Sequence, residues 1–373
     1  MQSSPEKIFL FLSMITKQQL PWVVLVLLAA GIKLFSLFPD AVERYYSNGI
    51  YLVTARLQRW LFGWVPFSVG DLFYGLLGIY LIYKIIELVK LLRKRQAGKT
   101  YWVSAMKRVL FTLLFVYVSF NLLWGLNYNR RGITYQLGLS TKKLTKEELG
   151  EVMELLVFKI NRLDSAGKTN RADLNNEKKL FGGAIASYKN LEKMQSIFAY
   201  PAPSIKSTLF VYLGNYLGYT GYYNPFTGEG QVNTKVPLFI QPFTTCHEIG
   251  HQLGYAKENE ANFAAYLSAK NSQDSAFLYS VYFELYSYGR PYLYKLDSVL
   301  LKTLDKQLLP GVKNDFRELQ NFFLRYENPV ERAIDKLYGR YLKANEQPSG
   351  KVTYSEVIIW LIAYYNKYGK DAL

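Results

Sequence analysis

Cysteine and histidine are almost absent from this chain, which has one cysteine and two histidines in 373 residues. The single cysteine, Cys246, excludes a disulfide within the chain, and we expect it to be a small buried core residue. Zinc sites built on three histidines are also excluded, because only His247 and His251 are present. Cys246 directly precedes His247, and neighbouring side chains on a helix point to different faces, so a histidine-based metal site would take a carboxylate as its third protein ligand.

Acidic residues are scarce too: 29 Asp and Glu stand against 45 Lys and Arg, a formal net charge of +16. Such an excess can indicate nucleic-acid binding. However, the sharpest basic clusters flank apolar segments, where they would meet anionic lipid headgroups. No nucleic-acid-binding motif accompanies them. We therefore expect a lipid bilayer as a partner and no nucleic acid.

The two histidines lie four residues apart around a glutamate, in His247-Glu248-Ile249-Gly250-His251. Residues four apart share one face of a helix, so both imidazoles can bind one Zn²⁺ while Glu248 acts as general base on a zinc-activated water. Chance would produce this arrangement roughly a few times in ten thousand. The alternative is a histidine pair on a solvated or core helix face that binds no metal.

A third ligand follows shortly after the motif. Gly254 suits a helix end, and a second helical pattern starts at Lys257, so the second helix can fold back on the first. Its first turn holds Glu258 and Glu260, and His₂Glu is a standard catalytic zinc set. We favour Glu258, with Asn262 one turn later to orient a ligand. The alternative for both glutamates is a solvated acidic first turn, favoured by the helix dipole.

These motifs resemble known proteins. Glu258 to Asn262, read as Glu-x-x-Ala-Asn, is similar to the second motif of gluzincin metallopeptidases, although the spacer from His251 is short and Asn262 replaces the more frequent acid. The short glycine turn resembles that of metzincins, whose third histidine is replaced here by Lys257. Together with Tyr-Tyr-Asn-Pro-Phe-Thr-Gly-Glu at 222–229 and three apolar spans, the chain resembles an uncharacterised bacterial family of membrane-anchored, zincin-like proteins. That resemblance implies no particular substrate.

A small sheet is expected before the motif. Residues 230–234 read as a short alternating strand after a turn-rich stretch, and residues 208–213 are a second strand candidate. In the zincin-type peptidases that the chain resembles, the edge strand of such a sheet holds extended substrate by main-chain pairing.

Three segments have the length and apolar character of membrane spans: about 20–38, 69–89 and 109–126. Each has the alternative of a buried core helix, and the first also that of a cleaved signal peptide. Residues 50–62, between the first two spans, are amphipathic and either lie along the membrane surface or pack on the soluble domain. We divide the chain into a membrane domain, 1–128, and a soluble domain, 129–373.

The positions of the basic residues predict on which side of the membrane the soluble domain lies. Basic residues without any acidic one follow the second span, a pattern that marks the cytoplasmic side of the membrane. The domain at 129–373 would then lie on the outer, periplasmic face of the cytoplasmic membrane, although Arg130 and Arg131 oppose this. The basic residues in question are Lys90, Arg93, Lys94, Arg95, Lys99, Lys107 and Arg108.

The soluble part reads as a mainly helical α+β domain. Thr145 and Glu148 form a capping box that opens a helix through Leu163. Further helices are expected at 275–288, 314–326, 330–342 and 354–368.

The sequence therefore predicts a membrane-anchored zinc metallopeptidase that hydrolyses peptide bonds of a peptide or protein substrate. The alternative is a catalytically silent zinc-binding sensor or interaction module anchored in the membrane. The oligomeric state and the group that stabilises the oxyanion stay open. Candidates for the oxyanion donor are Tyr222, Tyr223, Tyr282, Tyr286, Tyr288 and Arg290.

Overall fold

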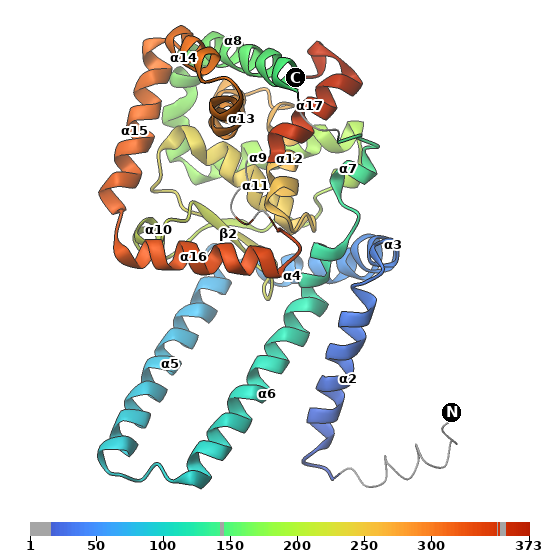
Figure 1. Ribbon diagram of the computed structural model, residues 1–373, viewed down its shortest axis with the longest axis vertical. Coiled ribbons are helices and arrows are strands. Elements are labelled where there is room, and N and C mark those ends of the chain that lie inside the picture. The colour runs from blue at the N-terminus through green and yellow to red at the C-terminus, as the bar shows by residue number, and fades with distance from the viewer. Residues whose placement is uncertain (1–15, 142–144, 349, 351–355) are drawn as a thin grey trace.

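The computed structural model describes residues 16–141, 145–348, 350 and 356–373. A mainly helical domain with a small mixed sheet stands on long apolar helices that extend from one side (Figure 1). Helices α5 (Val69–Arg93) and α6 (Lys99–Leu123) are long and apolar enough to cross a membrane. Helix α2 (Leu20–Phe35) counts as a third span only when it is joined to the bent run Pro39–Gly63.

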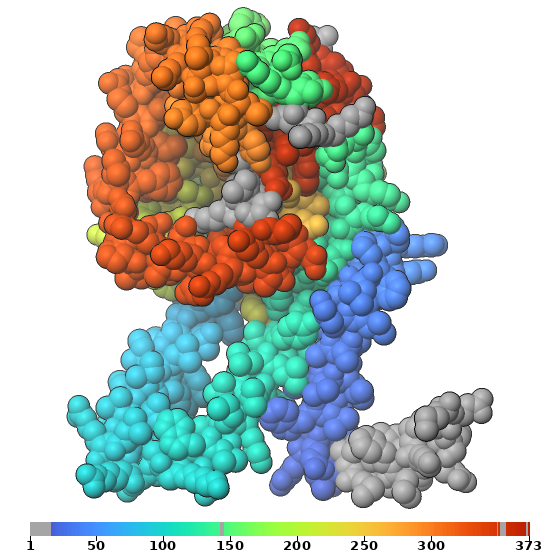
Figure 2. Space-filling model, in the orientation of Figure 1, coloured from blue at the N-terminus to red at the C-terminus, as the bar shows by residue number. Residues whose placement is uncertain are grey.

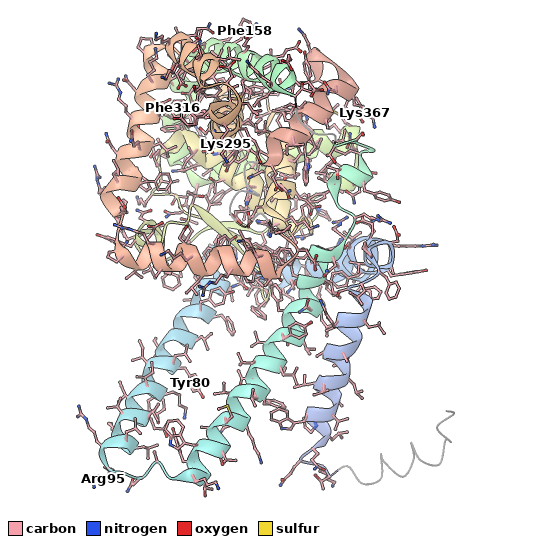
Figure 3. All side chains as sticks on the ribbon, viewed as in Figure 1. Tyr80, Arg95, Phe158, Lys295, Phe316 and Lys367 are labelled. Carbon is pink, nitrogen blue, oxygen red and sulfur yellow. The ribbon has the colours of Figure 1, made fainter. Side chains whose placement is uncertain are left out.

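The predicted spans are approximately placed. Helices α5 and α6 extend past the predicted spans at the ends far from the domain, whereas α2 and α6 each end three residues before the predicted end. Lys99, Lys107 and Arg108, which lie between the second and third predicted spans, are part of α6. Hydropathy marks only the apolar segment, whereas Lys and Arg are good helix formers that let the helix continue. The basic cluster nevertheless stays at the end of the spans far from the domain, where Figure 3 labels Arg95.

The amphipathic run between the first two spans packs on the domain. Helix α3 (Pro39–Ala41) and the π-helical segment η1 (Val42–Ile50) lead into α4 (Tyr51–Gly63), at an angle of 103° to α2. The Tyr51 hydroxyl and the Arg59 guanidinium donate to the carbonyl of Gln252, at 3.0 and 2.9 Å. The opposite face is apolar and exposed, with Trp60 67% accessible. Of the two expectations for this run, packing on the domain is the one observed.

The domain core lies among long helices around the histidine motif. Helix α8 (Lys146–Arg171) begins with the predicted capping box, in which Thr145 Oγ1 accepts from the backbone N–H of Glu148 at 3.2 Å. It packs along α13 (Ser275–Leu296), and both helices are eight residues longer than predicted. The other helices are α9 (Glu177–Met194), α14 (Ser298–Gln307), α15 (Pro310–Tyr326), α16 (Pro329–Ala344) and α17 (Val357–Tyr368). Helix α16 runs along the base of the domain, directly above the apolar helices (Figure 2).

The sheet has three short strands in the order β1 (Ile205–Ser207), β3 (Glu229–Val232), β2 (Gly221–Asn224). Strand β1 is parallel to β3, and β2 is antiparallel to it. The strand predicted at 230–234 overlaps β3. The one predicted at 208–213 is wrong, because that stretch leads into helix α10 (Val211–Leu217). A short apolar run fits either structure, and Gly218, with φ of 76°, supplies the left-handed helix end.

Candidate metal centre

The histidine motif lies on α11 (Gln241–Gln252), a helix in which every residue is buried. The helix ends before Gly254, whose φ of 84° turns the chain, and α12 (Glu258–Ala269) then folds back along it. Gly250 makes this close packing possible: a Cβ there would lie 3.2 Å from the Cα of Ala261. The turn therefore brings the first residue of α12, Glu258, against the histidines.

The structure groups His247, His251 and Glu258 around one point, with their ligand atoms within 4.8 Å of one another. Glu258 Oε2 lies 3.3 Å from Nε2 of His247 and 3.6 Å from Nε2 of His251. All three side chains are buried. These are the three residues that the sequence predicts as ligands.

The Nδ1 atoms of both histidines are already engaged. His247 Nδ1 lies 2.7 Å from Oδ1 of Asn262, the residue expected to orient a ligand, and His251 Nδ1 lies 2.8 Å from the carbonyl of Tyr255. A carbonyl can only accept, so His251 Nδ1 carries a proton. In neutral His251, Nε2 then directs a lone pair toward a carboxylate oxygen. This lone pair and the carboxylate oxygen of Glu258 repel each other unless a cation, either a proton or a metal ion, lies between them.

The electrostatics favour one positive charge at this point, on His251 rather than on His247, whose pKa burial lowers. Burial lowers the pKa of His251, but its hydrogen bond to Glu258 and the charge of that carboxylate outweigh burial and raise it to about 9. Burial raises the pKa of Glu258, yet the two histidines bring it below its usual range. Imidazole with carboxylate is a donor set that suits Zn²⁺, so the residues fit this ion.

Further side chains hold these three residues in place. The Tyr338 hydroxyl on α16 donates to Glu258 Oε1 at 2.5 Å, and the backbone N–H of Glu258 donates to Oε1 of Gln347 at 3.0 Å. The indole N–H of Trp124, just after α6, donates to the carbonyl of His251 at 3.1 Å. The sequence did not indicate these supporting residues. A tyrosine among 32 carries no local pattern that marks it as a neighbour of the site.

Glu260, the other ligand considered, lies elsewhere. Its Oε1 occupies the space in which a Cβ on Gly132 would stand, so its carboxylate faces the segment that precedes α7 (Ile133–Gln136). Burial raises the pKa of Glu260. Cys246 is fully buried, as predicted, and burial raises its pKa to about 12.

Glu248 lies between the ligands and the sheet. It is 2% exposed, and a Cβ on Gly221 of β2 would lie 2.6 Å from its Oε1. Its Oε2 has no hydrogen-bond partner among the residues that the structure describes. Burial raises the pKa of Glu248 to about 8. The carboxyl group is therefore well suited to exchange a proton near neutral pH.

Two cavities meet at these residues, and both are lined by Gly221, Tyr222, His247, Glu248 and Tyr338. The first, here called the membrane-side cavity, has a volume of about 530 Å³ and continues along α6. The second, here called the apolar cavity, has a volume of about 950 Å³ and lies between α5, α10, α15 and α16.

Residues 46–362 match the family described as protein of unknown function (DUF3810). The chain belongs to this family. The matched region of this DUF3810 chain includes α5, α6 and all three grouped ligands. No curated protein and no solved structure matches it.

The candidate oxyanion donors of the DUF3810 chain fall into two groups. Tyr282 donates to the carbonyl of Leu373, and Tyr286 and Arg290 donate to Asp305, so all three are engaged away from the site. The others line the cavities, although the Tyr222 hydroxyl donates to the carboxylate of Asp71. Those are Tyr222, in both cavities, Tyr223 in the membrane-side cavity and Tyr288 in the apolar cavity.

Proposed function

We propose that this protein is a membrane-anchored zinc metallopeptidase with a zincin-like catalytic domain. The observation that carries the proposal is the approach of His247, His251 and Glu258 to one point, with Glu248 buried beside them at a strand edge. Three protein ligands leave a position open for solvent, as in catalytic zinc sites, whereas structural zinc sites usually have four. A purely structural site would also have no need of Glu248.

Zn²⁺ held by His247, His251 and Glu258 would lower the pKa of a bound water and polarise the substrate carbonyl. Glu248 takes a proton from the attacking water as its oxygen bonds to the carbonyl carbon. Glu248 then delivers that proton to the amide nitrogen as the C–N bond breaks, which leaves a carboxylic acid and an amine. Asn262 and the carbonyl of Tyr255 keep the imidazoles in the orientation that presents Nε2.

The basic residues at the far ends of α5 and α6 support a place in the cytoplasmic membrane with the domain on the outer side. Peptides or proteins on that side are then the substrates. The second candidate function is a silent zinc-binding module, which would retain the ligands without turnover.

The test uses the full-length protein with zinc bound and casein as an unstructured probe. Glu248→Gln should retain zinc and reduce hydrolysis by about 10²- to 10⁴-fold, because the general base is lost. Glu260→Gln is the matched control and should keep both the bound zinc and the rate of hydrolysis. Hydrolysis that survives in Glu248→Gln would contradict the assigned role, and a zinc-loaded wild type that cleaves nothing would favour the silent module.

A further inference from the structure

We propose that the substrate is itself membrane-anchored: an apolar segment enters between α5 and α6, and its peptide bond is cut where it leaves the bilayer. This substrate class rests on the proposed peptidase function. It follows from the membrane-side cavity, whose wall includes both the metal ligands and residues of the apolar helices.

The cavity follows one face of α6 into the apolar part of the helix. Leu113, Val116, Tyr117 and Phe120 line it, together with Tyr74 of α5. At the helical rise, the stretch from Leu113 to Phe120 covers about 10 Å. Leu113 is 61% exposed although it lies in the middle of a candidate membrane span. Lipid or an apolar segment of another molecule therefore has direct access to this wall.

The arrangement of the helices leaves the side between α5 and α6 open. Helix α2 packs against α6, with the rings of Trp22 and Phe111 at 5.2 Å, whereas none of the apolar window of α5 is buried. Side chains project from all sides of α5, and Figure 3 labels Tyr80 about midway along it. An extended apolar segment can therefore lie beside α6 without displacing a packed helix.

The upper end of α5 is fixed to the sheet. The Glu229 carboxylate of β3 accepts from the backbone N–H groups of Val69 and Gly70, at 3.1 and 2.6 Å, and pairs with Lys206 at 2.5 Å. Asp71, in the same turn, accepts from the Thr208 hydroxyl at 2.9 Å. These buried contacts hold α5 in a fixed position beside the site, so the opening is part of the fold.

The sheet favours a peptide over a lipid as occupant. Strand β2 is the edge of the described sheet, and its Gly221 lies directly beside Glu248. An extended peptide can pair with such an edge through its main chain, which a lipid cannot do. The apolar cavity continues past this edge, where Ile240 and Phe243 offer an apolar surface for the substrate side chains.

The test compares two forms of one randomised peptide library of about 12 residues in phospholipid vesicles that contain the zinc-loaded protein. One form is free, and the other continues into a transmembrane segment of about 20 residues. Anchoring alone raises the local concentration of the peptide for every variant. Substitutions in the wall of the membrane-side cavity therefore test whether the apolar segment enters that cavity. Leu113→Trp places a larger side chain in the wall of the membrane-side cavity and so fills part of the cavity. Leu122→Trp is the matched control, because Leu122 is exposed on α6 but does not line the cavity.

We expect the wild type and Leu122→Trp to cleave the anchored form at least about 10-fold faster than the free form, and Leu113→Trp to lose most of that difference. Equal cleavage of both forms by the wild type, or an unchanged difference in Leu113→Trp, would overturn the membrane-anchored substrate and leave the peptidase proposal standing. Cleavage of neither form by the zinc-loaded wild type would overturn both.

Discussion

Tyr338 and Glu258 lie 80 residues apart in the chain, and the tyrosine hydroxyl donates to Oε1 of the glutamate at 2.5 Å. This hydrogen bond joins α16, at the base of the domain, to the carboxylate that faces both histidines. The ligand group is thus connected to the part of the domain nearest the apolar helices (Figure 2). Partners of this kind orient ligands, and their loss typically weakens metal binding by about 10- to 100-fold.

Tyr338→Phe should therefore reduce zinc affinity by at least about 10-fold while the protein stays folded. Affinity is measured by competition with a chelator of known strength. Tyr282→Phe is the matched control, because it also removes one buried hydroxyl, which donates at 2.8 Å to the Leu373 carbonyl. Equal zinc affinities for the two variants would show that Tyr338 does not support the ligand group.

Gly221→Ala should reduce hydrolysis without removing zinc. The added Cβ would lie 2.6 Å from Oε1 of Glu248 and 3.0 Å from the carbonyl of Gln231, so the carboxylate proposed as general base must shift. A misplacement of about 1 Å can reduce a rate by about 100-fold. Gly182→Ala on α9 is the control, since its Cβ meets nothing within 4 Å. Full activity in Gly221→Ala would show that hydrolysis does not depend on the position of the Glu248 carboxylate beside β2.

Lys206→Met should destabilise the domain and the attachment of α5. Lys206 and Glu229 form an ion pair with 6% and 0% side-chain exposure, and removal of the lysine leaves the buried carboxylate without its cationic partner. Loss of one partner of a buried pair typically costs about 3–5 kcal/mol. The double variant Lys206→Met, Glu229→Gln should recover part of this loss. Thermal unfolding in detergent measures the stability of both variants. An unchanged unfolding midpoint for Lys206→Met would contradict the expected loss of stability.

Local spacing explains which parts of the site could be predicted. His247, Glu248 and His251 share one helical turn, and Glu258 follows after a short turn marked by Gly254, so sequence spacing alone brings them together. The contacts that complete the group depend on tertiary structure. Tyr338 comes from the other side of the domain, and no local pattern distinguishes it from other tyrosines.

The same reasoning applies to the fold. The capping box at Thr145 and the apolar spans are strong local signals, and the structure contains both the cap and at least two helices of spanning length. The wrong strand at 208–213 is a short apolar run, for which periodicity cannot separate helix from strand. Helices begin or end beyond the predicted residues where favourable helix formers extend a helix past its apolar face, as at the start of α6.

The most direct test of the central claim is the zinc content of the purified full-length protein beside Glu258→Gln and Glu260→Gln. We predict about one zinc per chain in the wild type and in Glu260→Gln, and loss of zinc in Glu258→Gln, because Glu258, unlike Glu260, faces both Nε2 atoms. A folded wild type without zinc, or equal zinc in all three proteins, would contradict the proposed metal centre.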